Sequence, residues 1–318
     1  MDIEYLLWLQ ELRTGFLDWL LMGVTDFVVS PAMYAFVAII YWCINKRAAS
    51  FLAMNLSVGS MVNQGLKNTF CIYRPWVKHP EIVPLEAAKE SATGYSFPSG
   101  HTQVASSEFL SIAIWQRRKK WIVALCVLVT FLVMFTRNYL GVHTPQVVLA
   151  SLFVSCAVIF VNFKMLKWVD GGKNRDLTVF FSGICLAALF LAYTVLKPYP
   201  IDYAKDGTLL QNPQEMITDC YVSAGCVFGF LTGWILERRF VKFTIQVPKN
   251  LKIARGVFGV VILGVASVFL RDAMTKINMH WGEFVFFFLA FLFIMALYPA
   301  VFTVFEKYLA KKRNNHGK

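Results

Sequence analysis

Charged residues are scarce in this chain of 318 residues, since only 16% of its positions are charged whereas 57% are hydrophobic. A globular core cannot bury so much apolar surface, so the composition excludes an ordinary soluble protein and favours the bilayer as solvent. Cysteine occurs at seven positions without paired spacing, mostly inside apolar runs. The sequence therefore predicts neither a disulfide framework nor a cysteine metal site.

The chain also shows no internal repeat, no low-complexity tract and no cleavable signal. Residues 1–4 contain two acids where a signal peptide has basic residues, so we expect the first true span to direct insertion. The leucine- and tryptophan-rich segment at 3–22 carries Arg13 and Asp18. This pattern predicts a helix that lies in the membrane interface.

Nine apolar runs predict an all-α fold, a polytopic bundle of about nine transmembrane helices. Most runs approach the ~20 residues that a membrane-spanning helix needs. They cover residues 27–45, 50–68, 101–116, 121–137, 144–163, 177–196, 217–236, 254–270 and 283–305.

The placement of the basic residues indicates how the bundle is oriented. Alternate connections hold 21 of the 31 lysines and arginines against four acids; they lie at 46–50, 117–120, 164–176, 237–255 and 306–318. The positive-inside rule puts these connections in the cytoplasm, with the N-terminus outside and the C-terminus inside. The net charge of +12 is therefore a topology signal that needs no nucleic acid, and the basic face suits anionic membrane lipids.

Three polar segments fall at span ends that this topology places on the outer face. The first contains Lys67 and Arg74, the second is residues 97–101, and the third runs from Thr136 to His143. Three cations, two imidazoles and a Ser-Gly turn at one water-facing edge suit a phosphate ester, whose oxygens need several fixed donors. A neutral histidine can attack phosphorus while a protonated one gives its proton to the leaving alkoxide.

These segments resemble the type 2 phosphatidic acid phosphatase superfamily, whose signature is K-x6-R-P, then P-S-G-H, then S-R-x5-H-x3-D. Six residues separate Lys67 from Arg74-Pro75, residues 98–101 read PSGH, and five residues separate Arg137 from His143. The resemblance covers the first five apolar runs. Three ordered elements at the expected span ends are far more specific than one short motif.

The resemblance implies a role for each matching residue. His143 is the nucleophile that forms a phosphohistidine, and His101 is the general acid. The phosphate is held by Lys67, Arg74, Ser99, Gly100 and Arg137. No metal and no cofactor are implied.

The chain departs from the signature at two positions. Thr136 replaces the usual Ser and keeps a hydroxyl group, whereas Val147 replaces the Asp that orients the nucleophilic imidazole. Neutralising the equivalent acid in serine protease triads lowers turnover by roughly 10⁴. We therefore expect weakened activity, with Gln146, Asn138 or a backbone carbonyl as candidate substitute acceptors.

The pattern favours an integral membrane phosphatase for an amphiphilic monoester or diphosphate, such as phosphatidic acid, an isoprenyl diphosphate, phosphatidylglycerophosphate or a sphingoid phosphate. Three alternatives stay open: a lipid phosphotransferase, a noncatalytic homologue that binds lipid phosphates, and a haloperoxidase, whose members are typically soluble. Single cations at span ends also snorkel toward headgroups without any ligand.

We expect three parts: an interfacial segment at 1–26, a phosphatase-like transmembrane core at 27–170, and a four-span extension of the same membrane domain at 171–318. Short connections favour a bacterial inner membrane, with the site on its extracytoplasmic face. The sequence does not indicate an oligomeric state.

Overall fold

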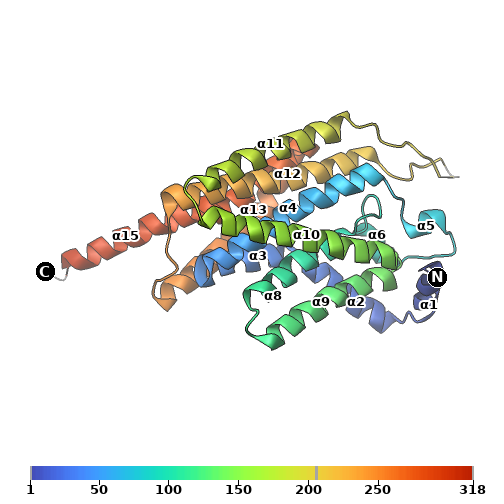
Figure 1. The fold of residues 1–318 in the computed structure, drawn as a ribbon, viewed down its shortest axis with the longest axis horizontal. Helices are drawn as coiled ribbons and strands as arrows, with labels where there is room; N and C mark the ends of the chain where they lie inside the picture. The colour runs from blue at the N-terminus through green and yellow to red at the C-terminus, as the bar shows by residue number, and fades with distance from the viewer. Residues whose placement is uncertain (1, 205–206, 317–318) are drawn as a thin grey trace.

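The computed structural model describes residues 2–204 and 207–316, which form helices joined mostly by short connections (Figure 1). In the first half these are α1 (Asp2–Glu11), α2 (Gly15–Val29), α3 (Pro31–Ile39), η1 (Ile40–Ile44), α4 (Lys46–Phe70), α5 (Pro75–Lys78), α6 (Glu86–Glu90), α7 (Gly100–Ala105), η2 (Ser106–Leu110), α8 (Ser111–Trp115) and α9 (Lys120–Tyr139). The second half holds α10 (Pro145–Asp170), α11 (Arg175–Leu196), α12 (Pro213–Leu236), η3 (Glu237–Val241), α13 (Lys249–Ile277), α14 (Met279–Leu292), η4 (Phe293–Leu297) and α15 (Tyr298–His316). Apart from an isolated bridge between Tyr203 and Leu209, these residues form no β-structure, which confirms the all-α class.

Six helices are long and apolar enough to cross a membrane: α9, α10, α11, α12 with η3, α13, and α14 continued through η4 and α15. The helix pair formed by α2 and α3–η1 passes the same test, although it is bent by 49°. The count is thus six or seven, and the expected nine spans are not confirmed. The difference lies in α4, which is long but polar, and in α7–α8, which reaches only from Gly100 to Trp115.

The N-terminal segment forms two helices where one interfacial helix was expected. Residues 12–14 separate α1 from α2, and the Thr14 side chain caps α2 by accepting a hydrogen bond from the Leu17 backbone N–H. The expected boundary after residue 26 lies inside α2, which continues to Val29. A new helix then begins at Pro31, because proline suits the first turn of a helix.

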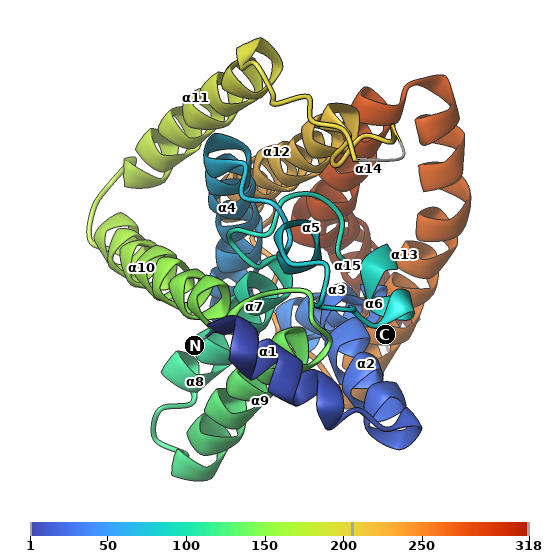
Figure 2. The ribbon, with the colours of Figure 1, turned by 90° about the vertical axis from the view of Figure 1, so that its right-hand side faces the viewer.

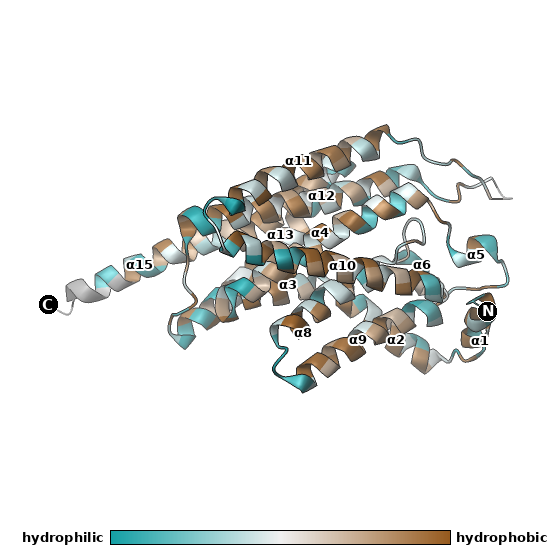
Figure 3. Cartoon of the chain, in the orientation of Figure 1, coloured by the Kyte–Doolittle hydropathy of each residue, from teal (hydrophilic) through white to brown (hydrophobic). Residues whose placement is uncertain are grey.

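Hydrophobic residues dominate the middle of the long helices, and hydrophilic residues gather toward their ends (Figure 3). Large side chains such as Leu189 on α11 and Phe269 on α13 are exposed on the outside of the bundle. An apolar surface of this extent marks contact with lipid. The chain is therefore an integral membrane protein.

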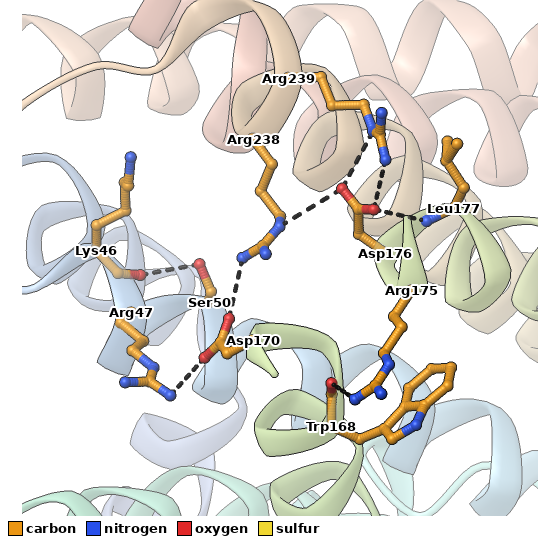
Figure 4. A network of polar contacts seen from close by, with 10 residues as sticks. All are labelled: Lys46, Arg47, Ser50, Trp168, Asp170, Arg175, Asp176, Leu177, Arg238 and Arg239. Carbon is orange, nitrogen blue, oxygen red and sulfur yellow. Dashed lines mark hydrogen bonds and ion pairs between the residues drawn. The ribbon is translucent and has the colours of Figure 1, made fainter. Parts of the chain in front are cut away.

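The two ends of the bundle differ in character. The N-terminus, α5 and α6 lie at one end, which faces the viewer in Figure 2, whereas the C-terminus lies at the other end (Figures 1 and 2). At the C-terminal end, Arg47 and Arg238 both bind Asp170, and Arg239 binds Asp176 at 2.6 Å (Figure 4). These ion pairs join the start of α4, the end of α10, the start of α11 and η3, which follows α12.

Candidate active site

The first polar segment begins in the last turn of α4, where Lys67 is buried. Cys71 ends this helix in the left-handed conformation, so the chain turns away immediately afterwards. Arg74 follows at the start of the short α5, which crosses the middle of the bundle end in Figure 2. The turn brings Arg74 back over the end of the helix that carries Lys67.

Arg74 is held by backbone carbonyls from two distant loops. Its Nε donates to Gly94 at 2.9 Å, its Nη2 to Thr93 at 2.8 Å and its Nη1 to Val142 at 3.1 Å. Gly94 has a positive φ, and a Cβ atom there would collide with the Met216 sulfur of α12. Glycine is therefore required at this point, and Arg74 ties the first and third segments together.

The second segment begins the helix that carries His101. Ser99 caps α7, because its hydroxyl group accepts from the Thr102 backbone N–H. The Ser99 backbone N–H donates to Ser151 Oγ of α10 at 2.6 Å, so it already has a partner and is not free for an anion. A Cβ atom built on Gly100 would meet nothing within 4 Å, so the backbone at the start of α7 borders open space.

The third segment folds back onto the end of α9. The Arg137 carbonyl accepts the backbone N–H groups of Val142 and His143, each at 3.2 Å, and Asn138 Nδ2 donates to the His143 carbonyl at 2.8 Å. The turn needs Gly141, whose φ is +74°. This local structure explains the five-residue spacing, since it sets His143 beside the helix end that holds Arg137.

The imidazole of His143 is buried between the first two segments. Its Nε2 lies 2.9 Å from Arg74 Nη1, and its Nδ1 lies 3.3 Å from Ser96 Oγ. Burial lowers the pKa of His143 well below its usual range, and the charges of Arg74, Arg137, Lys67 and His101 lower it further. His143 is therefore neutral at neutral pH, the state in which an imidazole is a nucleophile.

Several buried donors in this site have no partner in the described part of the chain. The Nε and Nη2 atoms of Arg137 are unpaired, and only its Nη1 has a hydrogen bond, to Thr25 Oγ1 at 3.3 Å. His101 Nε2 is likewise buried and unpaired. Unsatisfied buried donors of this kind are rare in proteins, and they are often explained by a functional role. Because the two Arg137 nitrogens carry N–H groups on a positively charged side chain, the site suits an anion.

The structure brings five residues of the sequence motifs close enough for their charges to interact: Lys67, Arg74, His101, Arg137 and His143. Ser99 and Gly100 directly precede His101 at the start of α7. Gln146 is exposed and neither ring nitrogen of His143 contacts it, so the structure does not bring it into the site. Val147 is buried, and its backbone carbonyl accepts from Ser151 Oγ at 2.6 Å. Asn138 contacts His143 only through the backbone carbonyl of His143.

Two residues of the site, Ser96 and Asp219, are not predicted by the sequence motifs. Ser96 precedes the second motif by only two residues, but a serine in a loop carries no pattern of its own. Asp219 lies on α12, and its charge acts on both Lys67 and Arg74. An ionisable carboxyl group within an apolar span is a candidate functional residue by default, so the sequence does contain a signal for Asp219.

Burial, together with the charge of Arg137, lowers the pKa of Arg74 to about 9, and Asp219 opposes this change. Arg74 therefore stays charged at neutral pH.

Residues 2–204 and 207–316 contain no group of three or more His, Cys, Asp or Glu side chains placed to hold a metal ion.

Comparisons with known proteins identify related chains. Lipid phosphate phosphatase delta of Arabidopsis thaliana is 23% identical over 218 residues, which are 62% of this chain and 50% of the plant protein. A probable sphingosine-1-phosphate phosphatase of Dictyostelium discoideum is 24% identical over 300 residues, 85% of this chain and 71% of the relative. Phosphatidylglycerophosphatase B of Escherichia coli K12 is 34% identical over 89 residues, 27% of this chain and 35% of the relative. No solved structure matches significantly.

Two family models match successive parts of the chain. The PAP2 superfamily model matches residues 47–170, which include all three motif segments. The model of the transmembrane extension of PAP2 superfamily phosphatases matches residues 221–312, which include most of α12 and the helices after it. Both models belong to the PAP2 superfamily and together they match more than half of the chain, so the chain belongs to this superfamily.

Proposed function

We propose that this protein is a membrane phosphatase that hydrolyses a lipid phosphomonoester or diphosphate. The observation that carries the proposal is the buried guanidinium of Arg137, whose Nε and Nη2 have no partner in the described part of the chain. A buried charge is costly unless it is paired. A phosphate group would accept from these donors, and the charges of Lys67 and Arg74 lie close enough to Arg137 to stabilise it as well.

The proposed reaction begins with His143. Its Nε2 accepts a hydrogen bond from Arg74, and this donor would turn to the phosphate when the ester binds, which frees the Nε2 lone pair for attack. Attack by Nε2 forms a P–N bond and breaks the P–O bond to the lipid alcohol, which takes a proton from His101. Water then attacks the phosphohistidine, gives a proton to His101 and releases inorganic phosphate. Lys67, Arg74 and Arg137 supply positive charge for this transfer, so the proposed reaction uses no metal or cofactor.

The proposed substrate is amphiphilic because the site lies at one end of a lipid-embedded bundle. The named relatives support this class: one is called a lipid phosphate phosphatase, one a probable sphingosine-1-phosphate phosphatase and one a phosphatidylglycerophosphatase. Phosphatidic acid, an isoprenyl diphosphate, phosphatidylglycerophosphate and a sphingoid phosphate are the substrates to compare.

We further propose that α4, the α7–α8 helix and the bent pair formed by α2 and α3–η1 span the membrane beside the six long apolar helices, which gives nine spans. The basic connections all adjoin the bundle end opposite the site (Figure 1). By the positive-inside rule this end is cytoplasmic, so the site faces the outside of a bacterial inner membrane. Residues 27–170 would form the catalytic core and residues 171–318 its extension.

Val147 predicts slow turnover, because no carboxylate stands at the position where the family has Asp. The test is phosphate release from a panel of lipid phosphates by the wild-type protein, His143→Ala and Val147→Asp. We expect measurable release by the wild-type protein, none by His143→Ala and faster release by Val147→Asp. Activity that survives His143→Ala would refute the mechanism.

The same assay separates the remaining alternatives. A phosphotransferase would place phosphate on an added lipid alcohol instead of releasing it. A noncatalytic homologue would bind lipid phosphates without turnover, and Val147→Asp alone would then restore release. For the proposed phosphatase, we expect inorganic phosphate as the product of the wild-type protein.

A further inference from the structure

Both ring nitrogens of the buried His143 have a partner. Arg74 Nη1 lies 2.9 Å from Nε2, and Ser96 Oγ lies 3.3 Å from Nδ1. Ser96 is itself buried, and its backbone N–H donates to the Ile72 carbonyl at 2.6 Å. Its hydroxyl group is therefore held in place beside the imidazole by the loop that follows α4.

The chemistry of these two partners fixes the tautomer of His143. A guanidinium group can only donate hydrogen bonds, so Nε2 must be the acceptor. A neutral imidazole then carries its proton on Nδ1, and the available acceptor for this proton is Ser96 Oγ. The arrangement leaves the lone pair on Nε2, the nitrogen that the proposed reaction uses.

The position that supplies a carboxylate in the family cannot do so here. The Val147 side chain has no acceptor, and its carbonyl is bound by Ser151. The charged or titratable groups that act on His143 are Arg74, Arg137, Lys67 and His101, all of them cationic when charged. Asp219 acts on Lys67 and Arg74, and Asp26 acts on Arg137, but neither is a hydrogen-bond partner of the imidazole.

We infer that Ser96 is the positioning residue of His143, and that its hydroxyl group replaces the missing carboxylate as acceptor of the Nδ1 proton. This inference rests on the proposed phosphatase function and refines it. A neutral hydroxyl keeps the productive tautomer but does not neutralise the positive charge that the ring gains on phosphorylation. Charge-assisted hydrogen bonds are about twice as strong as neutral ones, so serine supports slower turnover than aspartate would.

The kinetic test compares Ser96→Ala with Ser96→Thr, which retains the hydroxyl group. We expect Ser96→Ala to lower kcat about tenfold with little change in KM, because one neutral hydrogen bond is lost in the reacting state. Ser96→Thr should keep most of the activity. Ser106→Ala is the matched control, since Ser106 is equally buried but its hydroxyl group has no partner in the described chain.

A rescue experiment asks whether Ser96 acts through the imidazole. Adding Val147→Asp to Ser96→Ala offers Nδ1 a new acceptor, so kcat should return to the wild-type level or above it. A loss of activity that Val147→Asp does not repair would mean that Ser96 supports only the loop. That result, or wild-type turnover by Ser96→Ala, would overturn the inference.

The tautomer can also be observed without turnover, by ¹⁵N NMR of the full-length protein with labelled histidine. The His143 signals are assigned by their disappearance in His143→Ala. We expect a protonated Nδ1 and an unprotonated Nε2 in the wild-type protein, and loss of this preference in Ser96→Ala. A wild-type protein that is inactive on every lipid phosphate would refute the proposed function alone, whereas a proton on Nε2 would refute the role of Ser96.

Discussion

Arg74 and Arg137 are both buried in the candidate site, but their guanidinium groups have different partners. Arg74 donates to three backbone carbonyls and to the imidazole of His143. Arg137 donates only to Thr25 among the described residues and keeps two nitrogens unpaired. We therefore infer that Arg74 organises the loops around the site, whereas Arg137 is kept free for the ligand.

Substitution of each arginine by glutamine should separate these two roles. Arg74→Gln leaves several buried acceptors without a donor, at about 1–3 kcal/mol each, so both the unfolding temperature and the activity should fall. Arg137→Gln removes an unpaired buried charge, so the activity should fall while the unfolding temperature stays the same or rises. Thermal unfolding in detergent, measured beside phosphate release, distinguishes the two. Equal destabilisation by both variants would contradict the assignment.

The pH dependence of activity should reflect the lowered pKa of His143. The nucleophile must be neutral, so activity is lost as the pH falls through this pKa, and the wild-type loss should come below pH 6.5. Arg74→Gln removes one of the positive charges that lower the pKa of His143, so the acid limb of kcat/KM should move to higher pH.

Both proteins are compared on the same lipid phosphate, so that ionisation of the substrate affects both profiles equally. An acid limb that stays in place in Arg74→Gln would show that this arginine does not act on the His143 imidazole.

The motif spacing in the sequence reflects two local structures, the turn after α4 and the fold-back after α9, which explains why the charged residues and histidines of the motifs lie close enough to interact. It did not predict Ser96 as the partner of His143. That contact joins a loop residue to one 47 positions away, and nothing in the local pattern specifies it. The sequence suggests Gln146 as a substitute acceptor through its side-chain carbonyl, but the helix starting at Pro145 leaves this side chain exposed.

At the scale of elements, close packing of α12 against α14 connects the C-terminal half to the site. Gly225, Gly229 and Gly233 recur every four residues on α12 and lie against α14 and η4. Small residues at this spacing let two helices approach closely within a membrane. This packing holds in place the helix that carries Asp219 and Met216 beside the site.

Substitution at the centre of this contact tests the packing. A Cβ atom on Gly229 would collide with the backbone carbonyl of Phe288, which cannot move cheaply, so Gly229→Ala should destabilise the fold by about 1–3 kcal/mol. Gly264→Ala on α13 is the matched control, because a Cβ atom there meets nothing within 4 Å. Thermal unfolding should show a loss for Gly229→Ala only.

The apolar runs predicted where most helices lie, but not how many cross the membrane. Mean hydropathy is calculated along one helix at a time. It is low for α4 because this helix carries polar residues, although neighbouring helices bury them. Asn55, for example, donates to Ser111 at 2.7 Å and accepts from Asn162 at 2.8 Å. A central helix of this kind is sheltered by tertiary contacts, which a single-sequence average does not record.

At the scale of the molecule, the two ends of the bundle carry different kinds of charge. The site end holds buried cations without carboxylate partners within hydrogen-bonding distance in the described chain, whereas several cations at the opposite end, such as Lys46, Arg47 and Arg239, are paired with acids. The pairs at that end line a cavity of about 360 Å³ between α4, α10, α11 and η3. Paired charges stabilise the helix ends there, and unpaired ones leave the site ready for an anion.

The orientation of these ends can be tested with single cysteines at exposed positions. Glu81 lies between α5 and α6 at the site end, and Lys119 lies between α8 and α9 at the opposite end. In intact bacterial cells, a membrane-impermeant maleimide should label Glu81→Cys but not Lys119→Cys, because the basic connections are retained in the cytoplasm. Both should be labelled once the cells are made permeable.

The native cysteines require a background measurement, since Cys156 and Cys185 are exposed on the outside of α10 and α11. Their positions within apolar helices place them in lipid, where an impermeant reagent does not reach them. Cys71 at the end of α4 is partly exposed at the site end, so the labelling of each variant is measured against that of the wild-type protein. Labelling of Lys119→Cys alone in intact cells would reverse the orientation and place the site in the cytoplasm, where it would meet a different pool of lipid phosphates.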